Sequence, residues 1–558
     1  MNKCLLTFCL FTCFVVDNSY TQDIQITITT DSTYQTIAGF GGFGAKKVWW
    51  DSPPFYDQEY LNQVIDTLGC TFIRTQIYWD AEPVNDNADP MVIDWSKFKF
   101  DVNTDNGKQF TFIRDIGLKG AKLLATVWTP PIWMKGLEEF HGTLWANPVR
   151  RRPSDSDLDQ NCAWCGGADG CEQVGGWLKP EYYDEFAEYL VAYVKKVKEQ
   201  TGVDVWGINI QNEPYFANPF ESCVVIPEEY ADILKTVGER FATEGINTRL
   251  FGPEHMGEVT WGVNNEYIKE ILDDETVKPF LSFYAVHSYV DGVATDYGSA
   301  EGWTALYEKI VKTHDKELWM TETSDFDKQG YDLAFNMAKS LYLGLKFGHI
   351  SGWVYWAMAD YAIKNNKLTP LGRAFQQYYR FLLPGTVMIK ATAADNDLLV
   401  VAGKKNDNWV IIIINNSDQD KTIQLDGKGI PAEYKLFRTS AAEDFKQLPS
   451  TGLTGIIMKA NSISTLNYGN LPTKQEEIVS HEEIMVFPNP ARESIIIKNA
   501  RGCHFTLHDF QGRCLMAIPL ADPEQMINLS NLHAGVYMVT IAGSNRMITQ
   551  KLTIINQN

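Results

Sequence analysis

The stretch Gly207-Ile208-Asn209-Ile210-Gln211-Asn212-Glu213-Pro214-Tyr215 decides how the rest of the chain is interpreted. It ends an apolar run that starts at Val203, in which valine and isoleucine alternate with small residues, as in a strand buried on both faces. Pro214 cannot continue a central strand, so Glu213 is expected at the C-terminal end of that strand. A carboxylate is costly to bury, and a core does not need one. The stretch therefore predicts a functional carboxylate at a strand end.

The same pattern of an apolar run, polar residues and a helical stretch recurs from about residue 35 to residue 357. Eight alternating β/α units predict an α/β fold, the (β/α)8 TIM barrel. An open doubly wound sheet is the alternative, but the glycine-rich residues 39–44 lack the dinucleotide-binding spacing. The eight runs are residues 36–42, 71–77, 123–129, 205–213, 249–254, 283–289, 318–323 and 350–356.

The remaining segments differ in pattern from the barrel. The first residues have one lysine and a short apolar run, which is typical of a signal peptide and too short to span a membrane. Short strands with turn residues between them follow the barrel and predict an accessory β-sandwich. We expect a signal peptide at 1–21, a strand joining the sandwich at 22–34, the barrel at 35–384, the sandwich at 385–469, a polar linker at 470–484 and a small all-β module at 485–558.

Composition limits the partners of the protein. The net charge of -21 argues against nucleic acid or an anionic membrane surface and is compatible with a neutral polysaccharide. Aromatic residues make up 13% of the chain, which indicates either a ligand groove or aromatic packing inside a large barrel. We expect a monomer without a transmembrane segment.

Four cysteines stand apart from the others. Cys162, Cys165 and Cys171 crowd one glycine-rich loop, and Cys223 follows later in the chain. No histidine lies near this cluster, so a zinc site is disfavoured, and disulfides are predicted for an exported protein. The sequence leaves the pairing open. We expect neither a metal nor an organic cofactor.

Two carboxylates give the strongest functional signal. Glu213 follows the fourth apolar run, and Glu322 lies at the end of the seventh. In an eight-stranded barrel these two strand ends face each other across the mouth, where function gathers. Cleavage of a glycoside with retention requires two carboxyl groups about 5–5.5 Å apart. An ion pair at the rim is the alternative for either residue alone, but the two positions together favour a catalytic pair.

The motifs QNEP at residues 211–214 and WMTETS at 319–324, in a barrel preceded by IAGFGGFG at 37–44, resemble glycoside hydrolase family 30 of the retaining clan A. The segment LLPGTVMIKAT at 382–392 is also similar to the side sandwich of that family. The resemblance runs from about residue 35 to residue 468. It implies that Glu213 is the acid/base and Glu322 the nucleophile of a retaining β-glycosidase.

Neighbouring residues acquire roles from this arrangement. Asn212 is placed to donate to the 2-hydroxyl of the sugar, and Arg74 at the end of the second strand to keep Glu322 ionised. Tyr289 either hydrogen-bonds the nucleophile or packs in the core, and Glu254 supports the site from beside it. The candidate platforms for sugar rings, each of which plain packing also explains, are Trp128, Trp133 and Trp356.

The C-terminal module carries a second resemblance. The motifs FPNP at 487–490, DFQGR at 509–513 and GVYMV at 535–539 resemble the C-terminal sorting domain of the type IX secretion system. This resemblance implies a secreted or cell-surface protein whose partner during export is the type IX machinery.

The glycan is less defined by the sequence. Export and the many aromatic residues favour an endo-β-glycanase acting on xylan or β-1,6-glucan. The alternatives are an exo-acting β-glycosidase and a non-catalytic glycan-binding protein. The region 353–361 somewhat resembles the xylan-cleaving members of the family. These enzymes often bind a glucuronate side group of the xylan through an arginine. Residues 362–367 contain no arginine, and only Lys364 or Lys367 offers a point charge there.

Overall fold

The computed structural model describes residues 23–44, 58–101, 103–136, 140–141, 149–150, 175–214, 221–256, 259, 266–289, 299–359, 361–469, 484–501, 503–509, 513–520, 522, 524–542 and 547–555. The predicted signal peptide and all but the last residue of the predicted linker lie outside these residues. So do Cys162, Cys165 and Cys171; Cys223 is buried, and the predicted disulfides stay a prediction. None of the described helices is long and apolar enough to cross a membrane.

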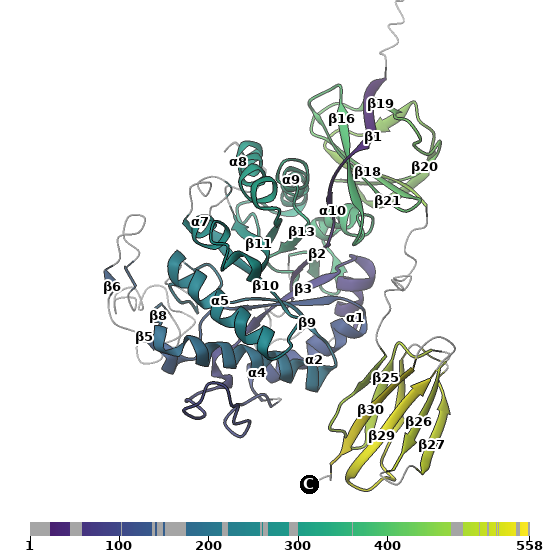
Figure 1. The fold of residues 1–558 in the computed structure, drawn as a ribbon. Helices are drawn as coiled ribbons and strands as arrows, with labels where there is room; N and C mark the ends of the chain where they lie inside the picture. Colours follow the sequence, from purple (N-terminus) through teal and green to yellow (C-terminus); the bar gives the residue numbers. More distant parts are fainter. Residues whose placement is uncertain are drawn as a thin grey trace, which may run out of the picture.

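Eight parallel strands close into a barrel, so the predicted TIM-barrel fold is confirmed (Figure 1). Neighbouring strands follow one another in chain order, and the last pairs with the first. All eight coincide with the apolar runs of the sequence. The strands are β2 (Gly39–Phe43), β3 (Phe72–Ile77), β4 (Lys122–Val127), β9 (Val205–Asn209), β10 (Arg249–Met256), β11 (Leu281–Ser288), β12 (Glu317–Thr323) and β13 (Gly352–Tyr355).

Aromatic side chains fill the interior of the barrel below its mouth. The rings of Phe283 and Trp319 stack with centroids 4.4 Å apart, and Phe251 stacks on Phe283 at 4.8 Å. Phe72 and Trp206 meet Trp319 at 5.1 and 5.6 Å. These side chains occupy the space inside the strands, so the barrel is a packed core, and polar chemistry is confined to the strand ends.

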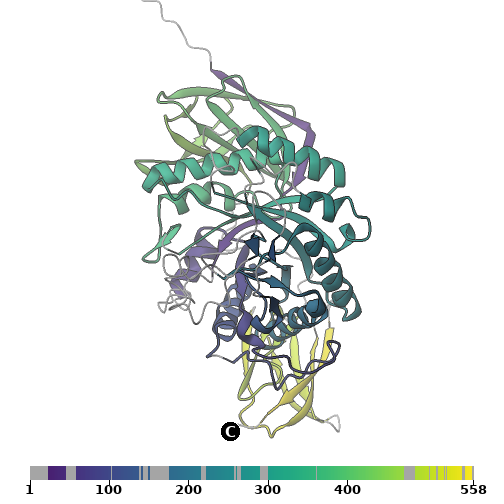
Figure 2. The same cartoon turned by 90° about the vertical axis from the view of Figure 1, so that its left-hand side faces the viewer.

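Helices surround the barrel on its outer face (Figures 1 and 2). Two of them begin at side-chain caps, because Thr104 and Thr369 accept hydrogen bonds from the amides of Gly107 and Gly372. The described helices are α1 (Gln58–Leu61), α2 (Asp105–Leu118), α4 (Tyr183–Thr201), α5 (Pro227–Thr243), α7 (Glu266–Leu272), α8 (Ser299–Leu306), α9 (Gly330–Leu343) and α10 (Pro370–Tyr379).

A second sheet packs beside the barrel and contains nine strands in one continuous hydrogen-bonded order. Side chains from strands near both ends of this sheet, such as Leu436 and Ile456, share one buried cluster, so the predicted β-sandwich is one sheet folded around its own core. The strands are β1 (Ile24–Thr36), β16 (Val387–Ala393), β17 (Leu398–Lys405), β18 (Asn408–Asn415), β19 (Lys421–Asp426), β20 (Tyr434–Ser440), β21 (Glu443–Thr451), β22 (Ile456–Met458) and β23 (Ser462–Tyr468).

The C-terminal module has two small sheets around a core of its own, as predicted for an all-β module. It touches the barrel where α4 ends. Gly202 ends that helix with φ +75°, and a Cβ there would lie 2.7 Å from the ring of Phe487. The strands are β24 (Met485–Phe487), β25 (Ser494–Lys498), β26 (His504–His508), β27 (Cys514–Pro519), β28 (Glu524–Asn528), β29 (Gly535–Ala542) and β30 (Met547–Ile554).

Candidate active site

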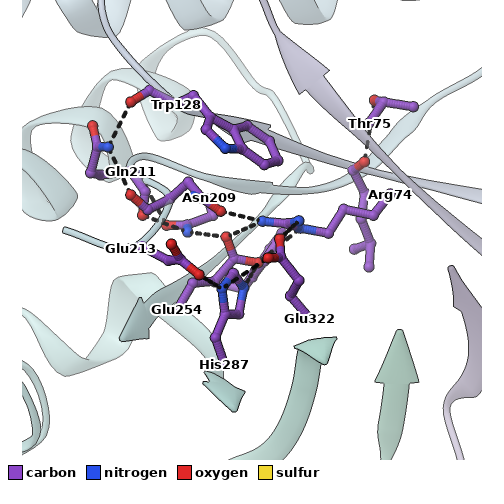
Figure 3. Close-up of polar contacts among 12 residues, drawn as sticks. Arg74, Thr75, Trp128, Asn209, Gln211, Glu213, Glu254, His287 and Glu322 are labelled. Carbon is purple, nitrogen blue, oxygen red and sulfur yellow. Dashed lines mark hydrogen bonds and ion pairs between the residues drawn. The ribbon is translucent and has the colours of Figure 1, made fainter. Parts of the chain in front are cut away.

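Charged side chains from five barrel strands meet at the mouth (Figure 3). Arg74 comes from β3, Glu254 from β10, His287 from β11 and Glu322 from β12, while Glu213 follows β9. All five are at most 4% exposed. So many charges are buried in one place only if they pair with one another, and here they do.

Two irregularities in the strand pairing direct the carboxylates into the barrel. The register between β10 and β11 skips Glu254, and the register between β11 and β12 skips Thr321. Side chains of a regular strand alternate between faces, so Thr321, not Glu322, would share the inner face with Trp319. The extra residue shifts this phase and turns Glu322 inward.

Arg74 binds three groups at once. Its Nη1 lies 2.6 Å from Oε2 of Glu322, and its Nη2 lies 2.7 Å from Oε2 of Glu254 and donates to Oδ1 of Asn212 at 2.7 Å. Its Nε donates to the other oxygen of Glu254 at 3.1 Å. Trp128 covers the guanidinium, with 4.7 Å between Cζ and the ring centroid. A planar fork with five donors fits these partners, and a lysine would not.

His287 lies among the three carboxylates. Its Nδ1 is 2.9 Å from Oε1 of Glu213 and 4.0 Å from Oε1 of Glu322, and its Nε2 is 3.4 Å from Oε1 of Glu254. Burial alone would lower the pKa of His287, but the charges of Glu322 and Glu254 and the bond to Glu213 raise it to about 9. Nδ1 of the resulting imidazolium donates to Glu213.

The pKa values of Glu254 and Glu213 are shifted in opposite directions by this environment. Burial would raise the pKa of Glu254, but the charges of Arg74 and His287 outweigh it and hold that pKa well below its usual range. Burial raises the pKa of Glu213 and the charge of Glu322 adds to the effect, although the bond from His287 opposes both. Glu254 is thus a permanent anion, while Glu213 holds a proton more readily than an ordinary carboxyl group.

The separation of Glu213 and Glu322 suits a two-carboxylate mechanism. One oxygen of each residue and a ring nitrogen of His287 all lie within 4.8 Å of one another. Glu213 has φ +40°, in the left-handed region that non-glycine residues rarely adopt, and such strain gathers at functional sites. The two carboxyl groups are close enough to act on the two atoms of a single bond placed between them.

Two further residues selected from the sequence also lie in this network. The hydroxyl of Tyr289 donates to Oε1 of Glu322, the oxygen that Arg74 leaves free. The backbone amide of Asn212 donates to the carbonyl of Val127 at 2.6 Å, which fixes the residue against β4. With Arg74 on one oxygen and Tyr289 on the other, the Glu322 carboxylate has a single orientation.

The predicted tryptophan platforms differ from one another. Trp128 is only 3% exposed and lies over Arg74, which favours the packing alternative for this residue over a platform for a sugar ring. Trp356 is partly buried and stacks on Phe43 at 4.8 Å. Trp133 is partly exposed, and its Nε1 donates to the carbonyl of Glu82 at 2.9 Å.

Several members of the site were not predicted from the sequence. His287 is one of them, although it stands at the end of the sixth apolar run, where polar side chains face the mouth. Asn209 donates to Oε2 of Glu254 at 2.7 Å from within β9. Phe326 is 57% exposed and stacks on Tyr289 with 5.2 Å between ring centroids. Its position three residues after β12, in a loop at the C-terminal end of a barrel strand, is the sequence feature that could have identified it.

Comparisons with known proteins agree with the resemblance drawn from the motifs. The chain is 26% identical over 293 residues to "Glucuronoxylanase XynC" of Bacillus subtilis (strain 168), a match that covers 50% of this chain and 63% of that protein. It is 22% identical over 242 residues to "Endo-1,6-beta-D-glucanase" of Neurospora crassa, covering 43% and 40% of the two chains. The chain thus spans less than two thirds of the length of these curated relatives.

Solved structures share the fold over a longer range. A GH30 endoxylanase from Clostridium papyrosolvens C71 superposes with a TM-score of 0.60 at 22% identity, over 80% of this chain and all of that one. Residues 485–555 match the family model "Secretion system C-terminal sorting domain". The chain therefore resembles glycoside hydrolase family 30 in its barrel and side sheet, and it carries a C-terminal segment of the secretion sorting-domain type.

Proposed function

We propose that this protein is a retaining β-glycoside hydrolase that cleaves a polysaccharide. The observation that carries this proposal is the pair of carboxylates Glu213 and Glu322, with one oxygen of each within 4.8 Å of the other. A separation near 5 Å leaves no room for a water molecule between the two groups, so one carboxylate acts as the nucleophile itself. The chemistry requires no metal or organic cofactor.

The environments of the two carboxylates assign their roles. Glu322 accepts from Arg74 and Tyr289, one on each carboxylate oxygen, so it is held in one orientation, which suits a nucleophile. Glu213 has a raised pKa because it is buried beside that charge, which suits a proton donor. Glu322 attacks the anomeric carbon while Glu213 protonates the leaving oxygen, and Glu213 then takes a proton from the water that releases the sugar.

The other charged groups position this pair. Glu254 anchors Arg74 through both carboxylate oxygens and accepts from Asn209, so it holds the arginine in the plane needed to reach Glu322. His287 fixes Oε1 of Glu213. The site thus keeps its reacting groups in place before substrate arrives, which reduces the reorganisation needed in the transition state.

An endo-β-glycanase acting on xylan is the substrate assignment that we favour. The named relatives and the solved neighbour include xylanases, and a β-1,6-glucanase is the next most frequent kind, so β-1,6-glucan is the second candidate. Lys364 and Lys367 face each other across the hairpin of β14 (Ile363–Lys364) and β15 (Lys367–Leu368). Both are exposed, and they supply point charges where the xylan branch has arginine, so strict dependence on a glucuronate branch is not expected.

Export through the type IX secretion system is part of the proposal. It is supported by the match of residues 485–555 to the sorting-domain family, and it places the enzyme outside the cell or on its surface, where polysaccharides are available. The machinery that reads this segment is the expected protein partner.

The test is a panel of polysaccharides that contains glucuronoxylan, unbranched xylan and β-1,6-glucan, with released reducing ends measured over time. An endo-acting enzyme gives a ladder of oligosaccharides, and an exo-acting enzyme gives a single small product. The anomeric configuration of the first product, followed by NMR, must match that of the substrate. An inverted product would rule out the double displacement, and binding without any release would favour a glycan-binding protein.

A further inference from the structure

A second group of buried carboxylates lies away from the catalytic pair, between the loop that follows β3 and helix α4. Glu82 and Asp86 belong to the loop, and Glu185 and Glu188 are one helical turn apart on α4. Their exposed fractions are 1%, 8%, 7% and 0%, in chain order. One oxygen each of Asp86, Glu185 and Glu188 lies within 4.8 Å of the other two.

These carboxylates lack the partners that the catalytic carboxylates have. Both oxygens of Glu188 and one oxygen each of Glu82 and Glu185 are buried without a hydrogen-bond partner. Within the described part of the chain, none of the four forms an ion pair with a lysine, arginine or histidine. Asp86 accepts from Asn87 and Asp94, and one oxygen each of Glu82 and Glu185 accepts from Asp86 and Asn85. Among the described residues Glu188 has neither kind of partner, which is rare for a buried carboxylate because it forfeits its solvation.

The energetic cost of this arrangement appears in the pKa values of the group. Burial and the charges of Asp86 and Glu185 raise the pKa of Glu188 to about 9. Burial and the charge of Asp86 raise that of Glu82 to about 8, although an amide bond opposes the shift. A compensating positive charge would relieve both effects.

The geometry fits a hard divalent cation. Two oxygens that each lie about 2.4 Å from one calcium ion can be no more than about 4.8 Å apart. The cluster meets this limit, supplies only oxygen ligands and draws them from a loop and a helix, which allows the variable geometry that calcium accepts. Magnesium fits less well, because it retains most of its water and is bound by fewer carboxylates.

We propose that Asp86, Glu185 and Glu188, with Glu82 beside them, form a structural calcium site. The ion joins the loop after β3 to the first turns of α4. The site is also linked to Trp133, because the backbone carbonyl of Glu82 accepts from Nε1 of that residue. The site goes beyond the proposed glycosidase function and takes no part in the bond cleavage.

The test uses the full-length protein with and without calcium. Removal of metal with EDTA should lower the thermal midpoint by at least about 5 °C, and added Ca²⁺ should restore it, because a ligand that binds only the folded state stabilises it. Terbium ions should give sensitised luminescence under tryptophan excitation, and Ca²⁺ should quench that signal by competition.

Substitutions of single carboxylates test whether the calcium ion binds at this cluster. In Glu188→Gln both the EDTA shift and the terbium signal should be lost, and Glu185→Gln provides the same test if the first variant does not fold. Glu199→Gln is the matched control, because Glu199 lies on the same helix in a partly exposed pair with Lys196 and should behave like the wild type. The proposal is overturned if the wild type shows neither effect, or if both effects persist in Glu188→Gln and Glu185→Gln. The first outcome would mean that shared protons neutralise the cluster, and the second that the ion binds elsewhere.

Discussion

Arg74 binds Glu322 with 2.6 Å between Nη1 and Oε2, and the arginine side chain has no exposed surface. The same guanidinium holds Glu254 through two bonds, so one cation serves two carboxylates. Breaking a buried pair by removing one partner is costly because the other charge stays buried. We therefore expect the arginine to be needed both for folding and for the orientation of Glu322, the proposed nucleophile.

Replacing Arg74 with lysine should impair activity and stability together. A lysine cannot reach Glu254 and Glu322 in one plane, so we expect kcat/KM to fall at least about 100-fold and the free energy of unfolding by about 3 kcal/mol. Steady-state kinetics and chemical denaturation measure the two effects. Arg114→Lys is the control, since Arg114 pairs with Asp115 at the surface. Wild-type activity in Arg74→Lys would contradict the assignment.

Removing either of the two proposed catalytic carboxylates should give a different product in the presence of azide. Glu322→Gln and Glu213→Gln should each lower kcat on polysaccharide by about 1000-fold or more. With an activated aryl glycoside and added azide, Glu322→Ala should give a glycosyl azide of inverted configuration, and Glu213→Ala one of retained configuration. Product NMR distinguishes them. The control is Glu308→Gln, at an exposed pair with Lys312, which should keep wild-type activity. If instead Glu322→Ala gave the retained azide and Glu213→Ala the inverted one, the two roles would have to be exchanged.

His287 should control the pH range of the reaction. Its bond and its charge lower the pKa of Glu213, whereas burial and Glu322 raise it. In His287→Asn the lowering contributions are lost, so the pKa of Glu213 rises and the alkaline limb of the kcat/KM profile moves to higher pH. The profile on a soluble polysaccharide measures this shift. An alkaline limb that stays in place or moves to lower pH would show that Glu213 is not the acid.

The raised pKa of His287 also predicts how stability depends on pH. A group whose pKa rises on folding contributes stability that is fully present below its unfolded pKa of 6.5 and is lost as the pH approaches about 9. The thermal midpoint of the wild type should therefore fall more steeply than that of His287→Asn between these two pH values. Calorimetry at several pH values tests this, and equal slopes would contradict it.

Phe326 should contribute to binding of long substrates. Its exposed ring lies against Tyr289, which itself binds Glu322, so a sugar beside the reacting one can stack on it. In Phe326→Ala we expect KM for polysaccharide to rise about five- to tenfold, with little change for a small aryl glycoside. Tyr34→Ala, at an exposed aromatic residue of β1, is the control. An equal loss on both substrates would place Phe326 in the structure of the site instead.

The sequence predicted the barrel because hydrophobic runs and helical stretches alternate regularly along it. It also selected Glu213, Glu322 and Arg74, because charged residues at strand ends are conspicuous in an apolar pattern. It did not reveal that Glu254 and Arg74 share two bonds, since such pairing depends on which strand ends face each other at atomic distance.

The irregular pairing at Thr321 could not be predicted either. Nothing in WMTETS distinguishes a regular strand from one with an extra residue, and only the neighbouring strand defines the register. For a related reason the sequence leaves two alternatives open at Trp128. An aromatic residue at a strand end can face a ligand or cover a buried cation, and the sequence carries no sign of which.

The side sheet has a consequence for the order in which the chain folds. β1 pairs with β16 and, in parallel, with β19, so Ile26 lies beside both Ala393 and Leu425. Contacts this distant in sequence form late, because the chain entropy lost in closing so long a loop must be recovered from other contacts. The first described strand must therefore wait, unpaired, until the whole barrel and β16 have emerged, and its second edge stays open until β19 follows. A chain that stops short of residue 421 would leave β1 with an open edge, ready to pair with another molecule.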